Sequence, residues 1–94
     1  MDGNKKTFVL DGGEMKTVKG AHAYIAEKLD FPDYYGKNLD ALADCLGELP
    51  RGVEIVLVNT DALKWNLGAY AKRLTEVFEE LSEPENAFSF RIER

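Results

Sequence analysis

A row of carboxylates without neighbouring bases is the part of this sequence that most clearly suggests chemistry. Asp40, Asp44 and Glu48 are four residues apart, so on a helix they lie along one edge, and no lysine or arginine occurs between Asn38 and Pro50. The helix dipole favours an acid in the first turn, which explains Asp40 but not Asp44. The row is therefore either ordinary solvated surface or a group of acids kept for a ligand.

A second row of acids occurs near the end of the chain, at helical spacing and with no base between its members. Its residues are Glu76, Glu79, Glu80 and Glu83. Repulsion of about 0.2–0.5 kcal/mol per pair is tolerated on a solvated surface. An ordinary exposed surface thus stays open as the interpretation of each row.

Three kinds of chemistry use exposed acids of this type. A catalytic acid and base, as in glycoside hydrolysis, need a cleft with supporting donors that 94 residues can scarcely build. A Mg²⁺ or Ca²⁺ site needs a dense Asp/Asn loop with a glycine pivot, which this sequence lacks. A rigid acidic helix can instead fill the phosphate-binding site of a nuclease through charge-assisted hydrogen bonds. We favour this third use, with an enzyme or metal-dependent module as a rival interpretation.

The other reactive side chains are too few for catalysis or metal binding. His22 is the one histidine and lies on or beside an apolar helical stripe, so we predict a packed, hydrogen-bonded residue. Cys45 lies between Asp44 and Glu48, whose charges raise a thiol pKa, so we predict an inert, partly buried residue. One histidine and one cysteine fall short of the ligands of zinc, and we expect no metal and no cofactor.

Two tyrosines precede the first acidic row. Aromatic residues beside a charged helix are typical anchors of protein interfaces, although loop packing is the ordinary interpretation. We predict that Tyr34 contacts a partner and that Tyr35 is more internal.

The overall charge favours a basic partner, although solubility also explains it. Net charge is −5, and the excess lies in residues 38–94, with eleven acids and six bases. This sign argues against direct binding of nucleic acid. The longest aliphatic run, residues 55–58, is too short to cross a membrane, and no secretory signal is recognisable. With one cysteine, which suits a reducing compartment, we expect a cytoplasmic protein.

Strands and helices alternate along the chain and must position these residues. The expected strands are residues 7–10, 53–58 and 87–92, and the continuous apolar run at 53–58 predicts a strand covered on both faces. The expected helices are residues 18–29, 38–46, 60–67 and 70–82. Asn38 is expected to cap the second helix and Gly47 to end it in left-handed geometry.

This alternation predicts an α/β fold. Strands separated by helices pair in parallel through right-handed crossovers, which gives a three-stranded parallel β-sheet packed with about four helices. The length corresponds to a single domain, residues 1–94, of which we expect 1–5 to be flexible.

Residues 31–46, FPDYYGKNLDALADCL, resemble the signature of the barstar family of ribonuclease inhibitors. The similarity runs through the block without a gap, and the order of elements elsewhere is compatible with the family. The resemblance implies an intracellular protein with a three-stranded parallel sheet and four helices. It also implies a partner, because family members block the active site of small, basic, secreted microbial ribonucleases such as barnase.

The resemblance also implies which residues face the nuclease. They are Tyr34, Gly36, Asn38, Leu39, Asp40, Ala43, Asp44, Gly47 and Glu80. Asp44 corresponds to the central phosphate mimic and Glu80 to a further acidic contact. Family members often carry tryptophan where Ala43 stands and an aromatic residue near Glu48, so the target nuclease can differ from the usual one.

Together these observations lead to one hypothesis and one alternative. The hypothesis is a non-enzymatic inhibitor, monomeric when free, whose acidic helix imitates RNA phosphates in a barnase-like ribonuclease. The alternative is an acidic interaction domain whose basic partner is not a nuclease.

Overall fold

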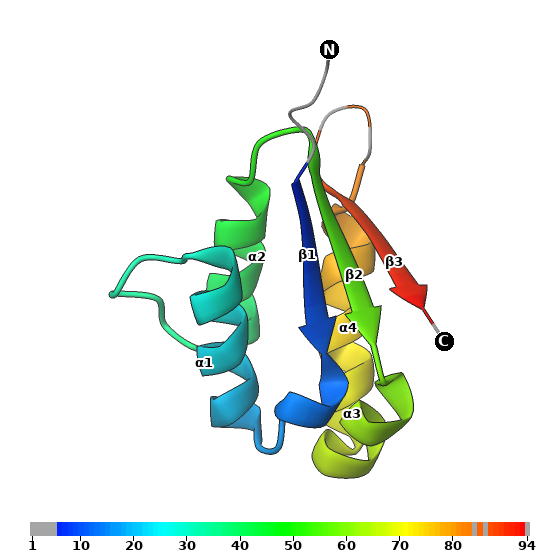
Figure 1. Ribbon diagram of the computed structural model, residues 1–94. Coiled ribbons are helices and arrows are strands. Elements are labelled where there is room, and N and C mark those ends of the chain that lie inside the picture. Colours follow the sequence, from blue (N-terminus) through cyan, green and yellow to red (C-terminus); the bar gives the residue numbers. More distant parts are fainter. Residues whose placement is uncertain (1–5, 84, 86, 94) are drawn as a thin grey trace.

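A three-stranded parallel sheet forms one layer of the molecule and helices form the other (Figure 1). The structure is a computed structural model that describes residues 6–83, 85 and 87–93, so the expected flexibility of residues 1–5 concerns a segment outside this set. The strands are β1 (Lys6–Asp11), β2 (Val53–Val58) and β3 (Ser89–Glu93), with β2 in the centre. Both strand pairs are parallel, which confirms the predicted α/β fold.

The four predicted helices form within a residue or two of their expected bounds. They are α1 (Val18–Leu29), α2 (Leu39–Gly47), α3 (Thr60–Leu67) and α4 (Ala69–Leu81). Thr17 caps α1, and its hydroxyl accepts a 2.9 Å hydrogen bond from the N–H of Gly20. Gly68 separates α3 from α4 at φ 60° and ψ −135°, a backbone conformation that is open almost only to glycine.

One helix end differs from the prediction. Gly47 is the last residue of α2 and does not have a positive φ; the cap is Glu48, at φ −97° and ψ −1°. The N–H of Glu48 donates to the carbonyl of Cys45 at 3.1 Å, so α2 ends in a tightened turn that needs no left-handed residue.

The loop expected after the first strand contains a short 3₁₀-helix, η1 (Gly12–Glu14). The Asp11 carboxylate caps η1 by accepting a 2.8 Å hydrogen bond from the N–H of Gly13. Gly12 is needed because a Cβ there would collide with the carbonyl oxygen of Asn59 and lie 2.8 Å from the Cβ of Leu63. These contacts join the end of β1 to α3.

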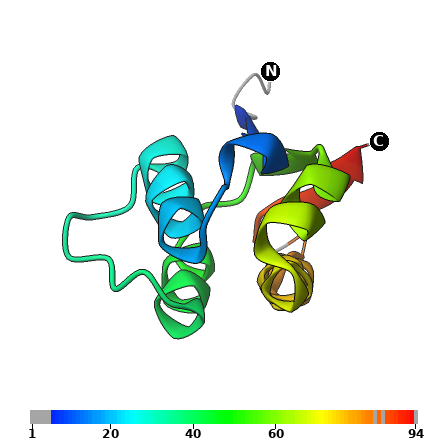
Figure 2. The same cartoon turned by 90° about the horizontal axis from the view of Figure 1, so that it is seen from below.

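The helices α1, α2 and α4 all cover the same face of the sheet (Figures 1 and 2). The prediction that β2 is covered on both faces is therefore wrong, because the covering helices lie on one face of the sheet only. Val56 lies outside the core between sheet and helices and is nevertheless 2% exposed, because Val9 and Arg91 flank it in register. A central strand can thus be apolar throughout with helices on one side only.

The core lies between the sheet and the three covering helices. Its fully buried side chains include Leu10, Ile25, Leu42, Leu46, Ile55, Leu74 and Phe88. Within the part of the chain that the structure describes, no helix combines the length and the apolar character needed to span a bilayer.

Candidate functional site

Helix α2 holds the first acidic row in a fixed orientation. The side-chain oxygen of Asn38 accepts a 2.8 Å hydrogen bond from a backbone N–H in the first turn, as predicted for a capping residue. Leu42 and Leu46 are fully buried, and α2 packs against α4. Asp40 and Asp44 are exposed. The three- and four-residue spacing of the leucines therefore turns both acids outward.

No cation pairs with these two acids within the described residues. The ion pairs found there are Lys72 with Glu76 at 3.8 Å, and Arg91 with Glu54 and Glu93, each at 3.0 Å. The acids of α2 thus face outward, and no base of the described residues lies within ion-pair distance of Asp40 or Asp44.

One member of the second acidic row pairs with a base that lies before the row. Lys72 lies one turn earlier on α4 and pairs with Glu76. Glu79 lines a pocket beside β3, whereas Glu80 is about 100° further round the helix and exposed. The carboxyl ends of α2 and α4 lie at the same end of the molecule (Figure 1).

The two tyrosines before α2 point in opposite directions. Tyr34 is 88% exposed, whereas Tyr35 is 7% exposed and packs on Phe31 with ring centroids 5.0 Å apart. The prediction that Tyr35 is the internal member is confirmed. Contact of Tyr34 with a partner stays a prediction.

The remaining predicted residues lie before the acids or between them in sequence and are wholly or partly exposed. Gly36 and Gly47 are exposed, and Leu39 and Ala43 are half-buried. A Cβ at Gly47 would meet no described atom within 4 Å, so this end of α2 is open to close approach.

A buried histidine lies behind this surface and confirms the predicted role of His22. Its side chain is 0% exposed, with Nδ1 2.7 Å from the hydroxyl of Tyr35 and Nε2 2.7 Å from the hydroxyl of Tyr70 on α4. Burial lowers the pKa of His22 below its ordinary value of 6.5. The role of Tyr70 could not be predicted from the sequence. Its helical spacing indicates only a core position, and His22, with which it forms the hydrogen bond, is 48 residues away.

Cys45 is half-buried, as predicted. Burial raises the pKa of its thiol above the ordinary value, and the charges of Glu48 and Asp44 raise it further. The direction agrees with the prediction, but burial is the larger cause. The thiol is therefore poorly suited to act as a nucleophile.

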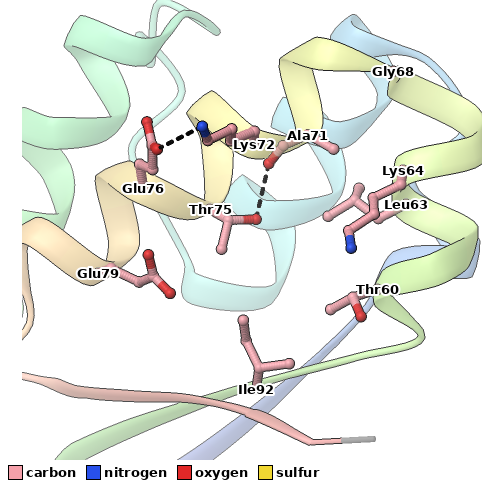
Figure 3. A pocket seen from close by; sticks show the side chains of 10 residues that line it. All are labelled: Thr60, Leu63, Lys64, Gly68, Ala71, Lys72, Thr75, Glu76, Glu79 and Ile92. Atoms are coloured by element: carbon pink, nitrogen blue, oxygen red, sulfur yellow. Dashed lines mark hydrogen bonds and ion pairs between the residues drawn. The ribbon is translucent and has the colours of Figure 1, made fainter.

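A separate pocket lies between α3, α4 and β3 (Figure 3). Its volume is about 580 Å³, and its apolar lining includes Leu63, Ala71 and Ile92. None of its lining residues comes from α2 or from the segment before it. In the described residues, no three His, Cys, Asp or Glu side chains gather as a metal site.

The geometry defines a small α/β domain with an exposed anionic helix beside an exposed tyrosine. The family model described as Barstar (barnase inhibitor) matches residues 5–93. A Bacillus subtilis (strain 168) protein named "Putative ribonuclease inhibitor YrdF" is 40% identical over 79 residues, which cover 83% of this chain and 87% of that protein. The chain therefore belongs to the barstar family.

Proposed function

We propose that this protein is a non-enzymatic inhibitor of a small, basic, secreted ribonuclease, whose active site it blocks with α2 as an imitation of RNA phosphates. The observation that carries the proposal is the exposure of Asp40 and Asp44 along one helix with no described cation on either. Membership of a family described by barnase inhibition and similarity to a protein named as a ribonuclease inhibitor support it.

Each part of the surface has a separate role in this proposal. Asp44 pairs with an arginine or histidine of the enzyme's active site, since carboxylates form strong charge-assisted bonds with such groups. Asp40 and Glu80 add attraction at the edge of the contact. Tyr34 supplies apolar packing. The remaining contacts are Gly36, Asn38, Leu39, Ala43 and Gly47.

The protein is proposed to act as a cytoplasmic monomer that protects the cell producing the enzyme. Titration of ribonuclease activity should then end at one chain per enzyme. An inhibitory unit of two chains would contradict the monomeric form.

Asp44→Ala tests the central contact. We expect it to weaken binding by about 2–5 kcal/mol, the usual effect of truncating one member of a buried interfacial charge pair; the barnase–barstar complex is among the systems behind that range. The measurement is the inhibition constant for barnase, with circular dichroism to show an intact fold. Glu14→Ala, which removes an exposed acid in η1, is the matched control and should inhibit like the wild type.

Two results would contradict the proposal. Unchanged inhibition by Asp44→Ala would remove α2 as the blocking element. A wild-type chain that inhibits neither barnase nor any member of a panel of small secreted ribonucleases would favour the alternative, a basic partner that is not a nuclease.

A further inference from the structure

The loop that presents Tyr34 is held to the molecule through one buried side chain. In the segment 30–38, Tyr35 is buried, Phe31 is half-buried and the other residues are exposed. A hollow of about 370 Å³ lies between this segment and α1. Asp30 ends α1 at φ 59°, and Lys37 has φ of 56°, a left-handed conformation that is unfavourable for lysine. Tyr35, with Phe31 packed against its ring, thus attaches the loop to the core.

The anchor is a chain of three polar side chains from three parts of the fold. The Tyr35 hydroxyl meets His22 of α1, and His22 meets Tyr70 of α4. A neutral imidazole has one N–H and one lone pair, so it donates to one hydroxyl and accepts from the other. These two hydrogen bonds therefore link the Tyr34 loop to α4, the helix that carries Glu80.

We propose that His22, Tyr35 and Tyr70 are positioning residues of the inhibitory surface, and that protonation of His22 releases the Tyr34 loop and weakens capture of the ribonuclease. This inference rests on the proposed function and extends it to the regulation of the same surface by pH.

Protonation is disruptive because, among the described residues, no anionic side chain is found beside the ring. The imidazolium would donate from both nitrogens, so the hydroxyl that had donated to the ring must redirect its proton. The titratable and charged groups on this side are Tyr35 from the loop, Tyr70 from α4, Cys45 of α2 near Tyr35, and Arg73, which lies 5.3 Å from the centre of the Tyr70 ring. None is an anion at neutral pH, and Arg73 adds a like charge.

The first test measures the free protein, so it does not depend on any partner. Amide hydrogen exchange is followed by NMR in Tyr35→Phe and Tyr70→Phe. The reporters are the N–H groups of Tyr35 and Ala41, which donate to Pro32 O at 3.0 Å and to Asn38 Oδ1 at 2.8 Å. We expect these amides to exchange about tenfold faster, since one buried hydrogen bond is lost, while the amides of β2 are unchanged.

Tyr24→Phe is the matched control for the exchange experiment. The Tyr24 hydroxyl also accepts a hydrogen bond, 2.9 Å from the N–H of Asp11, but lies outside the anchoring chain. It should leave the Tyr35 and Ala41 amides at their wild-type rates. Equal effects of all three variants, or no effect of Tyr35→Phe, would overturn the anchor.

The second test measures barnase inhibition by the same variants. Tyr35→Phe and Tyr70→Phe should weaken inhibition about tenfold, and Asp44→Ala should weaken it without changing loop exchange. Faster loop exchange with unchanged inhibition would overturn the positioning role. If the wild type inhibits no ribonuclease, the proposed function fails, and the exchange rates alone decide whether these residues anchor the loop.

The pH profile separates positioning from a merely structural role. Above pH 6.5 the inhibition by the wild type should not change with the protonation of His22, and it should weaken as pH falls through the lowered pKa of His22, relative to His22→Gln measured with the same enzyme. Parallel profiles for the two proteins would overturn the pH dependence. If His22→Gln does not fold, NMR titration of His22 replaces it: the pKa must be lower in the barnase complex than in the free protein, and equal values would overturn the inference.

Discussion

At the scale of single side chains, two adjacent residues of α2 differ in their exposure to solvent. Asp44 is exposed, and the adjacent Cys45 is turned partly into the structure, close enough to Tyr35 to affect its titration. Because successive side chains on a helix point in different directions, Asp44 is available to solvent or a partner while Cys45 packs inward.

Cys45 should react slowly with alkylating agents. Burial, then Glu48 and Asp44, raise the pKa of the thiol, so less thiolate is present at neutral pH. We expect iodoacetamide to modify it more slowly at pH 7.5 than free cysteine, and Asp44→Asn to increase the rate. Mass spectrometry follows the reaction. A rate equal to that of free cysteine would show that the thiol is not perturbed.

His22 should make the fold less stable in mild acid. Its pKa is lowered in the folded protein, so the unfolded chain takes up the proton first. The contribution of His22 is complete above pH 6.5 and is lost as pH falls through the folded-state pKa, by at most about 1.4 kcal/mol per pH unit. Urea unfolding from pH 7.5 to 5.0, compared with His22→Gln, isolates this residue from the carboxylates. Identical slopes for the two proteins would exclude it.

At the scale of elements, the caps and turns decide where each acid is presented. The Asn38 cap starts α2 so that Asp40 falls in its first turn, and Glu48 ends the helix without a left-handed residue. Gly12 matters for a different reason: because it has no Cβ, the end of β1 can approach α3 closely.

Two glycine substitutions should therefore change stability in opposite directions. Gly12→Ala forces a Cβ against Asn59 and Leu63 and should cost about 1–3 kcal/mol in free energy of unfolding. Gly47→Ala is helical and unobstructed among the described residues, so it should stabilise the protein by about 0.5–1 kcal/mol. Urea unfolding measures both. A destabilising Gly47→Ala would mean that this backbone is not helical in solution.

At the scale of the whole molecule, the acids of residues 38–94 give one part of a small domain a negative field. Five of these eleven acids lie on α2 and α4, which pack side by side on the same face of the sheet (Figure 2). Such a field attracts a basic enzyme before contact.

Salt should therefore act mainly on association. Raising ionic strength from 0.05 to 0.5 M (on the order of a threefold shorter screening length) should slow capture of barnase more than it speeds release. Asp40→Asn and Glu80→Gln should reduce this dependence. Stopped-flow measurements give both rates, and a salt effect confined to release would contradict steering.

Much of the fold could be predicted because its signals are local. The spacing of Leu42 and Leu46, the Asn38 cap and the β-branched run of β2 each act within a few residues, and each element forms where they indicate. The exposure of Asp44 follows from the same local spacing. Two predictions were wrong, the left-handed end at Gly47 and the cover on both faces of β2. Each of these features depends on which parts of the fold pack nearby.

The helices, the strands, their parallel pairing and the outward direction of the acids could be inferred from sequence alone, since these follow from periodicity, capping and the alternation of elements. Packing in three dimensions was needed to show that His22 lies between Tyr35 and Tyr70 and that the helices leave one face of the sheet open. Both features depend on how separate elements pack around a common core. Because the burial of apolar surface is non-directional, no local sequence pattern encodes that arrangement.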